Sequence, residues 1–297
     1  MIKTLTLLAA VAAALLASDA VGQSLAPAGA VAAVRPSVHD QRLTIELGGH
    51  RFGLAARVFR PAGSGPFPLV VINHGTPVSI ADARNTSLGY TPAAQWFAAQ
   101  GYMVVVALRP GFGNSDGPYM EPGGPCGNRD YVHDGRETAA VEAAIAESAA
   151  ALPDADPKRI VVLGQSAGGF GAIALADDPP PGVVGVISFA GGRGGDDHEH
   201  ICGGVARLIE AAAVFGKANR LPQIWLYAAN DHFFAPPVAH ALAQAYQGAS
   251  GPHIAFVDLP PFDDDGHKTF AHADPSVWAA PVSAFLSGLV PGAAPAK

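Results

Sequence analysis

A serine between glycines is the strongest chemical signal in the sequence. Residues 164–168 read Gly-Gln-Ser-Ala-Gly, directly after an apolar run at 160–163 and directly before an Ala-rich segment. A serine on such a strand-to-helix turn projects above the edge of a sheet, beside free N–H groups at the start of a helix that favour negative charge. We therefore predict that Ser166 is a nucleophile. The competing interpretation is a Gly-rich turn that holds an ordinary serine.

A nucleophilic serine needs a base, and the base needs a carboxylate that orients it. His267 lies after the last predicted strand, in a loop that can carry its ring back over the sheet edge. Asp231 closes an apolar strand on the same edge, so the sequence predicts a triad of Ser166, Asp231 and His267. The weaker candidates are His253, His272 and Asp258, together with the acidic run 263–265, which is more typical of a solvated loop.

Two backbone N–H groups are expected to bind the oxyanion that forms when the serine attacks a carbonyl. One belongs to Ala167, at the start of the helix that follows the nucleophile. The other belongs to Thr76, in a His-Gly-Thr-Pro turn at 74–77 where Gly75 permits a sharp bend. The alternative for this turn is a plain loop with a structural histidine.

These residues need a scaffold that gathers them at one edge. Short apolar runs alternate with Ala-rich segments, which predicts an α/β fold: a mostly parallel sheet with helices on both faces and an antiparallel pair of strands at its N-terminal edge. Functional groups of such sheets gather at the carboxyl ends of the strands. The predicted strands are 42–47, 54–59, 69–73, 102–108, 159–163, 183–189, 223–228 and 254–259. The predicted helices are 91–100, 134–152, 168–176, 205–215, 237–246 and 275–289, the last with a candidate kink at Pro281.

Composition and charge exclude some classes of function. Hydrophobic residues make up 49% of the 297 residues, which is enough to bury a sizeable core. The net charge is −7 and no cluster of Lys and Arg is present, so we expect no nucleic-acid partner. His198 and His200 are spaced as two metal ligands can be, but no third ligand is evident, and a hydrated loop without metal is favoured.

The N-terminus is typical of an exported protein. Residues 1–20 have the layout of a secretory signal peptide: a positive start, an apolar run at 5–16 and small residues before a cleavage site after Ala20. The run is short for a membrane span, so we expect a periplasmic or extracellular protein without a stable membrane anchor. Residues 21–38 resemble a linker, and 39–291 are expected to form one catalytic domain.

The chain has two cysteines, Cys126 and Cys202, each in a Gly-rich loop. In an exported chain an even number of cysteines favours a disulfide; the alternative is two unrelated buried thiols. Such a bridge would join the segments 109–135 and 191–204, which we expect to frame the pocket because long irregular segments in a compact domain are often functional.

The order of Ser166, Asp231 and His267 on alternating strands and helices resembles the α/β-hydrolase superfamily. Within it, the chain is similar to the dienelactone-hydrolase-like branch. The similarity spans residues 69–270 and rests on His74-Gly75, the run Arg-Pro-Gly-Phe-Gly-Asn-Ser at 109–115, Gly164–Gly168, Asn230-Asp231 and Asp265-Gly266-His267. Dienelactone hydrolases use a cysteine nucleophile where this chain has a serine. The resemblance therefore implies a cofactor-free enzyme that acts on general carboxylic esters rather than on dienelactones.

We expect an exported serine esterase that cleaves a small-molecule ester through an acyl-enzyme intermediate. Three other functions stay open: a serine peptidase of the same fold, an acyltransferase, and a catalytically silent binding protein. An acyltransferase would share every residue named above, so only product analysis with an acceptor alcohol separates it from an esterase. No motif indicates the natural substrate or the oligomeric state.

Overall fold

The structure is a computed structural model and describes residues 37–248 and 254–290. The predicted signal segment 1–20 therefore lies outside the described residues. Strand β1 (Ser37–Leu47) begins inside the predicted linker 21–38, whose earlier part is likewise outside the described residues. In the part of the chain that is described, no helix is both long and apolar enough to span a membrane.

One sheet of eight strands forms the centre of the fold, in the order β1-β2-β4-β3-β5-β6-β7-β8. The pairings β1–β2 and β2–β4 are antiparallel, and all later neighbours are parallel. The predicted parallel sheet with antiparallel strands at its N-terminal edge is thus confirmed. The remaining strands are β2 (His50–Arg60), β3 (Phe67–Asn73), β4 (Met103–Ala107), β5 (Ala155–Gln165), β6 (Val183–Phe189), β7 (Gln223–Ala228) and β8 (Ile254–Leu259).

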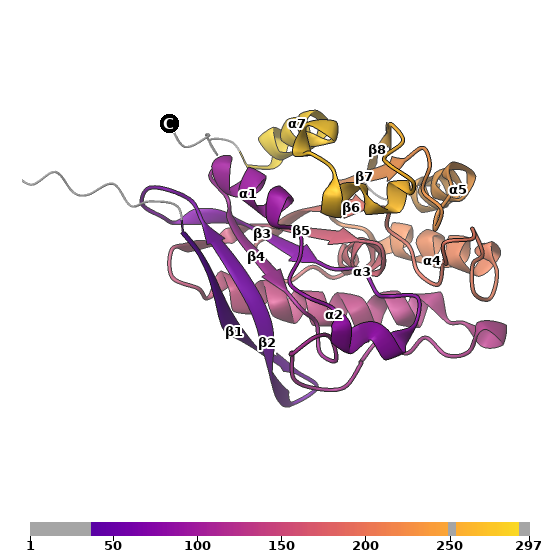
Figure 1. Cartoon of the computed structure of the whole chain (residues 1–297), viewed down its shortest axis with the longest axis horizontal. Coiled ribbons are helices and arrows are strands. Elements are labelled where there is room, and N and C mark those ends of the chain that lie inside the picture. The colour runs from indigo at the N-terminus through magenta and orange to yellow at the C-terminus, as the bar shows by residue number, and fades with distance from the viewer. Residues whose placement is uncertain (1–36, 249–253, 291–297) are drawn as a thin grey trace, which may run out of the picture. The chain divides into compact units, whose positions relative to one another are not determined.

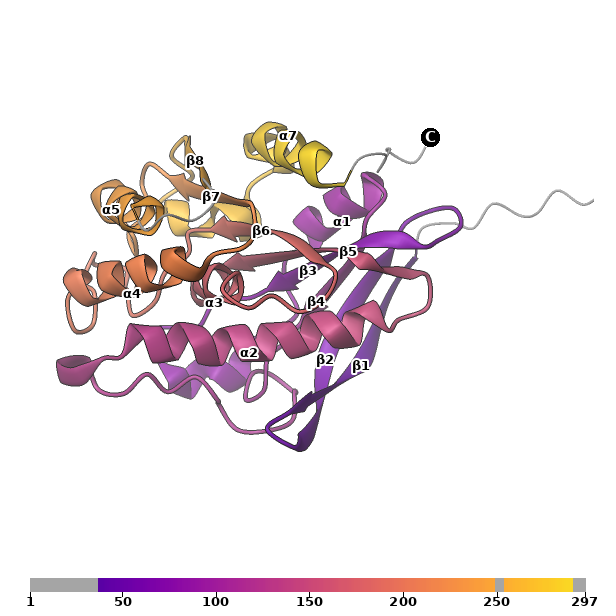
Figure 2. The same ribbon diagram turned by 180° about the vertical axis from the view of Figure 1, so that it is seen from behind.

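Helices cover both faces of this sheet (Figures 1 and 2). Helices α2, α3, α4 and α5 pack on one face, and α1, α6 and α7 pack on the other. The α-helices are α1 (Thr91–Ala99), α2 (Tyr131–Ala150), α3 (Ala167–Leu175), α4 (Val205–Ala218), α5 (Pro236–Gln247), α6 (Thr269–His272) and α7 (Ala279–Leu289). Short 3₁₀ turns are η1 (Ile80–Asn85), η2 (Cys126–Asn128), η3 (Gly266–Lys268) and η4 (Pro275–Val277).

The central strands are apolar on both faces because helices cover both faces. In β3, Leu69 and Val71 join the core under α2 to α5, whereas Val70 and Ile72 join the core under α1 and α7. Side chains alternate between the faces of a strand, so a continuous apolar run feeds both cores. Burial of each such side chain contributes about 1.5–3 kcal/mol. The rigid edge that these strands form is where the predicted site residues lie.

The predicted helix 275–289 is two elements in the structure. Turn η4 ends before Trp278, and α7 begins after it. Trp278 is fully buried, and its ring stacks on Phe97 of α1 with 5.8 Å between ring centroids. This tertiary contact sets the break, which the local sequence does not reveal. Pro281 lies in the first turn of α7, where the helix has no internal hydrogen bond to lose.

A disulfide joins Cys126 to Cys202, as the sequence predicted. Cys126 lies in the long segment between β4 and α2, and Cys202 lies in the loop between β6 and α4. The bridge closes a loop across 76 residues of sequence and ties together two segments that approach the carboxyl edge of the sheet.

Removal of this bridge should lower stability markedly. Because the crosslink restricts the unfolded chain, we expect Cys126→Ser/Cys202→Ser to lose about 4 kcal/mol of unfolding free energy relative to the oxidised wild type. Urea unfolding measures the difference. Wild type unfolded under a reductant is the matched control and should approach the double variant. A double variant as stable as the oxidised wild type would contradict the expectation.

Candidate active site

Ser166 lies between β5 and α3, at the carboxyl edge of the sheet, and its backbone is strained. Its φ of 55° and ψ of −122° lie in a region that residues with a side chain seldom adopt. Such a conformation costs about 1–3 kcal/mol and persists only where the surroundings enforce it. Here the Ser166 N–H donates to the Phe189 carbonyl at 3.0 Å, and the Ser166 carbonyl accepts from the Gly192 N–H at 3.1 Å. Neighbouring strand and loop backbone thus hold the serine in place.

Two glycines permit this turn. A Cβ atom at Gly164 would lie 2.2 Å from the carbonyl carbon of Gly168. A Cβ atom at Gly168 would lie 2.6 Å from the carbonyl oxygens of both Asn73 and His74. Neither contact is tolerable, so the glycines allow β3, β5 and α3 to approach one another closely beneath Ser166.

His267 and Asp231 meet at the same edge of the sheet. The His267 Nδ1 atom lies 3.1 Å from Oδ1 and 3.2 Å from Oδ2 of Asp231, whose side chain is fully buried. The N–H groups of Phe233 and Phe234 also donate to Asp231 Oδ1, each at 2.9 Å. An ionised carboxylate only accepts, so Nδ1 carries the ring proton and Nε2 keeps its lone pair. Within the described residues, no hydrogen bond joins this ring to the Ser166 hydroxyl.

The turn that carries His267 is fixed by a second aspartate. Asp265 Oδ1 accepts from the His267 N–H at 2.9 Å and from the His232 N–H at 3.2 Å. Gln165 Nε2 donates to the His267 carbonyl at 2.5 Å, which links the turn to the residue before Ser166. The interpretation of 263–265 as a wholly solvated loop is therefore wrong for Asp265, which is buried. An aspartate two residues before a turn residue is a local hydrogen-bonding signal that could have revealed this role.

The other candidates for base and carboxylate lie elsewhere. His272 is exposed at the end of α6. Asp258 is exposed on β8 and pairs with His240 at 2.9 Å. His253 lies outside the described residues.

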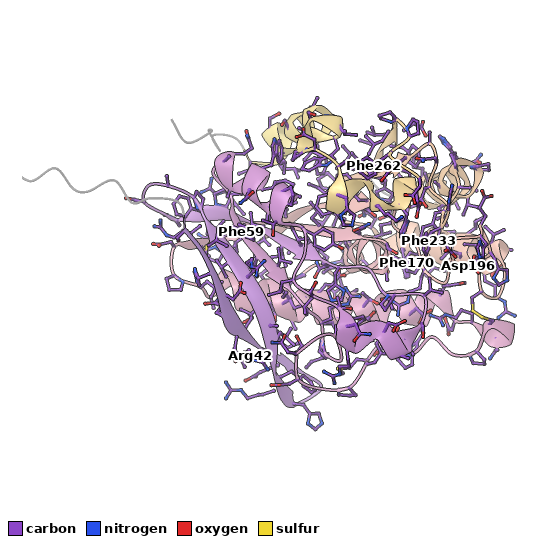
Figure 3. The ribbon with its side chains drawn as sticks, in the orientation of Figure 1. Arg42, Phe59, Phe170, Asp196, Phe233 and Phe262 are labelled. Carbon is purple, nitrogen blue, oxygen red and sulfur yellow. A yellow bond between two sulfur atoms is a disulfide. The ribbon has the colours of Figure 1, made fainter. Side chains whose placement is uncertain are left out.

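Aromatic rings enclose the His267 side chain. Phe233 stacks on it with ring centroids 4.1 Å apart, and Phe234 lies tilted at 5.7 Å. Figure 3 shows Phe233 and Asp196 on the side of the molecule remote from Arg42 of β1, and both residues line the cavity described below. The stacked rings exclude water from one face of the imidazole and restrict its rotation.

The turn after β3 approaches Ser166 closely. A Cβ atom at Gly75 would lie 3.0 Å from the Ser166 Cβ atom, which is tighter than ordinary packing. Thr76 and Ala167 line the same cavity as Ser166. Among the described residues, neither the Thr76 N–H nor the Ala167 N–H donates a hydrogen bond, so both remain available to a ligand.

His74 and Arg109 brace this turn from below. His74 Nε2 accepts from the Arg109 N–H at 3.0 Å, so its proton is on Nδ1, which donates to the Gly75 carbonyl at 2.6 Å. Burial, reinforced by the Arg109 charge, lowers the pKa of His74 to about 3, and the ring stays neutral. The Arg109 guanidinium also donates to the His74 carbonyl, and to Thr76 Oγ1 at 3.3 Å. His74 therefore has a structural role, as in the alternative interpretation of this turn, and it supports the same turn that carries Thr76.

A buried ion network, which the sequence did not reveal, extends from Arg109. Glu121 bonds Arg109 through Oε1 at 2.5 Å and Arg193 through Oε2 at 2.8 Å. All three side chains are at most 3% exposed. Burial alone would raise the pKa of Glu121, but the two guanidinium groups hold it at about 2. Glu121 and Arg193 are 72 residues apart, so no local pattern indicates the pair.

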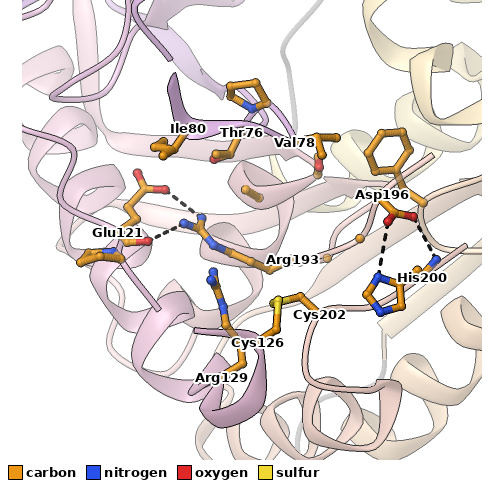
Figure 4. Close-up of a pocket in the computed structure, with 18 of the residues that line it drawn as sticks. Thr76, Val78, Ile80, Glu121, Cys126, Arg129, Arg193, Asp196, His200 and Cys202 are labelled. Carbon is orange, nitrogen blue, oxygen red and sulfur yellow. Dashed lines mark hydrogen bonds and ion pairs between the residues drawn. A yellow bond between two sulfur atoms is a disulfide. The ribbon is translucent and has the colours of Figure 1, made fainter. Parts of the chain in front are cut away.

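A cavity of about 610 Å³ opens above Ser166. Its walls come from the turn after β3, the segment between β4 and α2, and the loop after β6, together with Phe233 and Phe234. Figure 4 shows the disulfide at one side of this cavity and Arg193 reaching across to Glu121. The segments 109–135 and 191–204 thus both line the pocket. Its wall includes His200, which pairs with Asp196 at 3.4 Å, and in the described part of the chain no group of three or more ligating side chains could hold a metal ion.

Glu121 should be critical for stability. Glu121→Gln removes the anion that two buried guanidinium groups share, so we expect a loss of about 3–5 kcal/mol of unfolding free energy. Asp40→Asn is the matched control, because it breaks an exposed pair with Arg57 and should cost about 1 kcal/mol or less. Denaturant unfolding of both variants tests the comparison. Equal losses would show that the buried network contributes no more to stability than the exposed pair does.

The sequence of this chain matches a known protein family. Residues 49–247 match the X-Pro dipeptidyl-peptidase (S15) family, which is more than half of the chain. No match was found among curated proteins.

Solved structures of hydrolases share the fold. An esterase from Pyrococcus furiosus superposes with a TM-score of 0.59 at 15% identity, over 85% of this chain and 91% of the esterase. Porphyromonas gingivalis dipeptidyl peptidase 4 gives 0.60 at 16% identity over 86% of this chain, but only 36% of that longer protein. A puromycin-hydrolyzing peptidase from Mycobacterium tuberculosis gives 0.53 at 20% identity, over 86% of this chain and 40% of the peptidase. The chain therefore has an α/β-hydrolase fold and belongs to the X-Pro dipeptidyl-peptidase (S15) family.

Proposed function

We propose that the protein is a serine hydrolase that cleaves carboxylic esters through an acyl-enzyme intermediate, with Ser166 as nucleophile, His267 as base and Asp231 as its orienting carboxylate. One observation carries the proposal: a serine in a strained turn shares a sheet edge with a histidine whose Nδ1 is held by a buried aspartate at 3.1 Å. Membership of a hydrolase family supports it.

In this reaction, the Ser166 oxygen attacks the ester carbonyl carbon while its proton passes to Nε2 of His267. The carbonyl electrons move to oxygen, and the N–H groups of Thr76 and Ala167 bind the resulting oxyanion. When the carbonyl re-forms, the C–O bond to the alcohol breaks, and the leaving oxygen takes the proton from Nε2. A water molecule then repeats the two steps and releases the acid from Ser166.

The surroundings of His267 suit the transient positive charge on its ring. The Asp231 carboxylate is fully buried, so its attraction for the imidazolium is weakly screened by solvent. Two backbone N–H groups hold this carboxylate in place, and Phe233 limits ring rotation. The strained Ser166 turn keeps its hydroxyl at the cavity rather than in the sheet.

We propose ester cleavage rather than peptide cleavage because it is the less demanding of the two reactions. An alcohol leaves more readily than an amine, so a triad strong enough for a peptide bond also cleaves esters. The family match favours a second candidate, a peptidase that cleaves after an X-Pro dipeptide. The similarity to the dienelactone-hydrolase-like branch and an acyltransferase reaction are further hypotheses for the same residues.

We also infer that the protein is exported. The leader-like pattern of residues 1–20 supports this, and so does the Cys126–Cys202 disulfide, because disulfides persist in oxidising compartments.

Loss of the Ser166 hydroxyl should abolish hydrolysis. We expect Ser166→Ala to lower kcat on p-nitrophenyl acetate, butyrate and octanoate by at least about 10³-fold, because the acyl-enzyme cannot form. Ser287→Ala is the control, since Ser287 is an exposed serine of α7 that bonds only to its own helix. Equal activity of wild type and Ser166→Ala would exclude this nucleophile. Release of p-nitroaniline from Ala-Pro-p-nitroanilide at a kcat/KM above that of the esters would favour the peptidase instead.

A further inference from the structure

Tyr119 lines the same cavity as Ser166, and the O–H group of its phenol is a donor without an acceptor among the described residues. Its phenol oxygen accepts from Arg193 Nη2 at 2.5 Å. A guanidinium only donates, so the hydrogen of the phenol points elsewhere, and no acceptor for it exists within the described residues. Burial raises the pKa of Tyr119, so the hydroxyl keeps its proton at neutral pH. The bond from Arg193 polarises this hydroxyl and makes it a stronger donor.

Arg129 contributes a second donor to the same cavity. Its Nε donates to Asp134 Oδ2 at 2.7 Å, and its Nη1 donates to the Gly124 carbonyl at 3.1 Å. Its Nη2 has no acceptor in the part of the chain that is described. Figure 4 shows the Arg129 guanidinium directed toward Arg193. The Nη1 and Nη2 groups of Arg193 itself donate to Glu121, Thr138 and Tyr119, and its Nε lies 4.0 Å from Asp134 Oδ2.

The charges around Tyr119 and Arg129 do not cancel. Arg109, Arg129 and Arg193 supply three positive charges, whereas the carboxylates that contact them are Glu121 and Asp134. Glu142 lies fully buried nearby, and neither of its carboxyl oxygens has a hydrogen-bond partner among the described residues. Burial raises the pKa of Glu142 well above its usual range, so it stays neutral. The excess of positive charge is local to these three arginines, because Asp196 adds a negative charge elsewhere in the lining of the cavity.

We propose that Tyr119 and Arg129 form a carboxylate subsite, so that the preferred substrate is an ester whose acyl group ends in a carboxylate. An oxygen of that carboxylate accepts from the Tyr119 hydroxyl, and the Arg129 Nη2 group bonds the same anion. The local excess of positive charge around the three arginines favours an anion over a neutral acceptor at this position. This inference rests on the proposed function, because it assigns the acyl side of the substrate attached at Ser166.

The test compares matched esters. Monomethyl succinate, glutarate and adipate carry the distal carboxylate at three different distances from the ester carbonyl. Each is paired with the methyl ester in which an isopropyl group replaces the carboxylate. We expect at least one acid ester to have a kcat/KM more than about tenfold above its isopropyl partner, as for a charge-assisted hydrogen bond. Tyr119→Phe should lower that ratio by about fivefold or more, mainly through KM, because it removes a single hydrogen-bonding oxygen.

Controls separate binding from folding. Tyr102→Phe changes a buried tyrosine that contacts Phe97 in the core under α1 and α7, and it should leave the ratio unchanged. Arg129→Lys keeps the positive charge but removes the Nη2 donor of the guanidinium, so it should lower the ratio. Arg136→Gln removes an exposed charge of α2 and should leave the ratio unchanged. Thermal unfolding of each variant shows whether the fold is intact.

Binding to Ser166→Ala distinguishes failure of this inference from failure of the proposed function. Calorimetric titration of that variant with the same ester pairs needs no turnover. Tighter binding of an acid ester, lost on adding Tyr119→Phe, supports the subsite even if hydrolysis is not detected. Hydrolysis of all esters with no preference for the acids, or a preference that Tyr119→Phe leaves unchanged, overturns the subsite and leaves the hydrolase standing.

Discussion

The structure depends on one steric constraint: the backbone at Ser166 has a positive φ, and three segments must pack closely to hold it there. Strand β3, strand β5 and helix α3 meet beneath the serine, at distances that only glycine permits at positions 164 and 168. The parallel sheet supplies the rigid strands, and the turn after β3 supplies Thr76 near the hydroxyl. Any added side chain at these glycines would push the turn away and separate the groups that the proposed reaction needs together.

Buried charge is the second organising feature. Glu121 holds Arg109 under the turn after β3 and Arg193 under the cavity wall, so one carboxylate couples the proposed oxyanion site to the proposed substrate subsite. Buried ions are costly unless each is paired, which explains why so many donors of these arginines are taken by backbone carbonyls and hydroxyls. Tyr119 and Arg129, which keep unused donors, both line the cavity.

The sheet, its antiparallel edge and the disulfide could be predicted from the sequence, because apolar periodicity and cysteine number are local signals. The assignment of Ser166, Asp231 and His267 stays a prediction, although the structure brings Asp231 and His267 into contact. Other features could not be predicted because they depend on tertiary contacts. Trp278 interrupts the last helix because it packs on α1, Asp265 is buried by the turn it caps, and Glu121 meets Arg193 across 72 residues.

The most direct test of the central claim is covalent labelling with a fluorophosphonate, followed by mass spectrometry of the digested protein. A serine activated by His267 displaces fluoride from phosphorus, so the account predicts a single adduct on the peptide that contains Ser166. The same adduct should form far more slowly in His267→Ala, while Ser287 stays unlabelled in both proteins. Labelling of another residue, or equal labelling rates in wild type and His267→Ala, would contradict the proposal that Ser166 is an activated nucleophile.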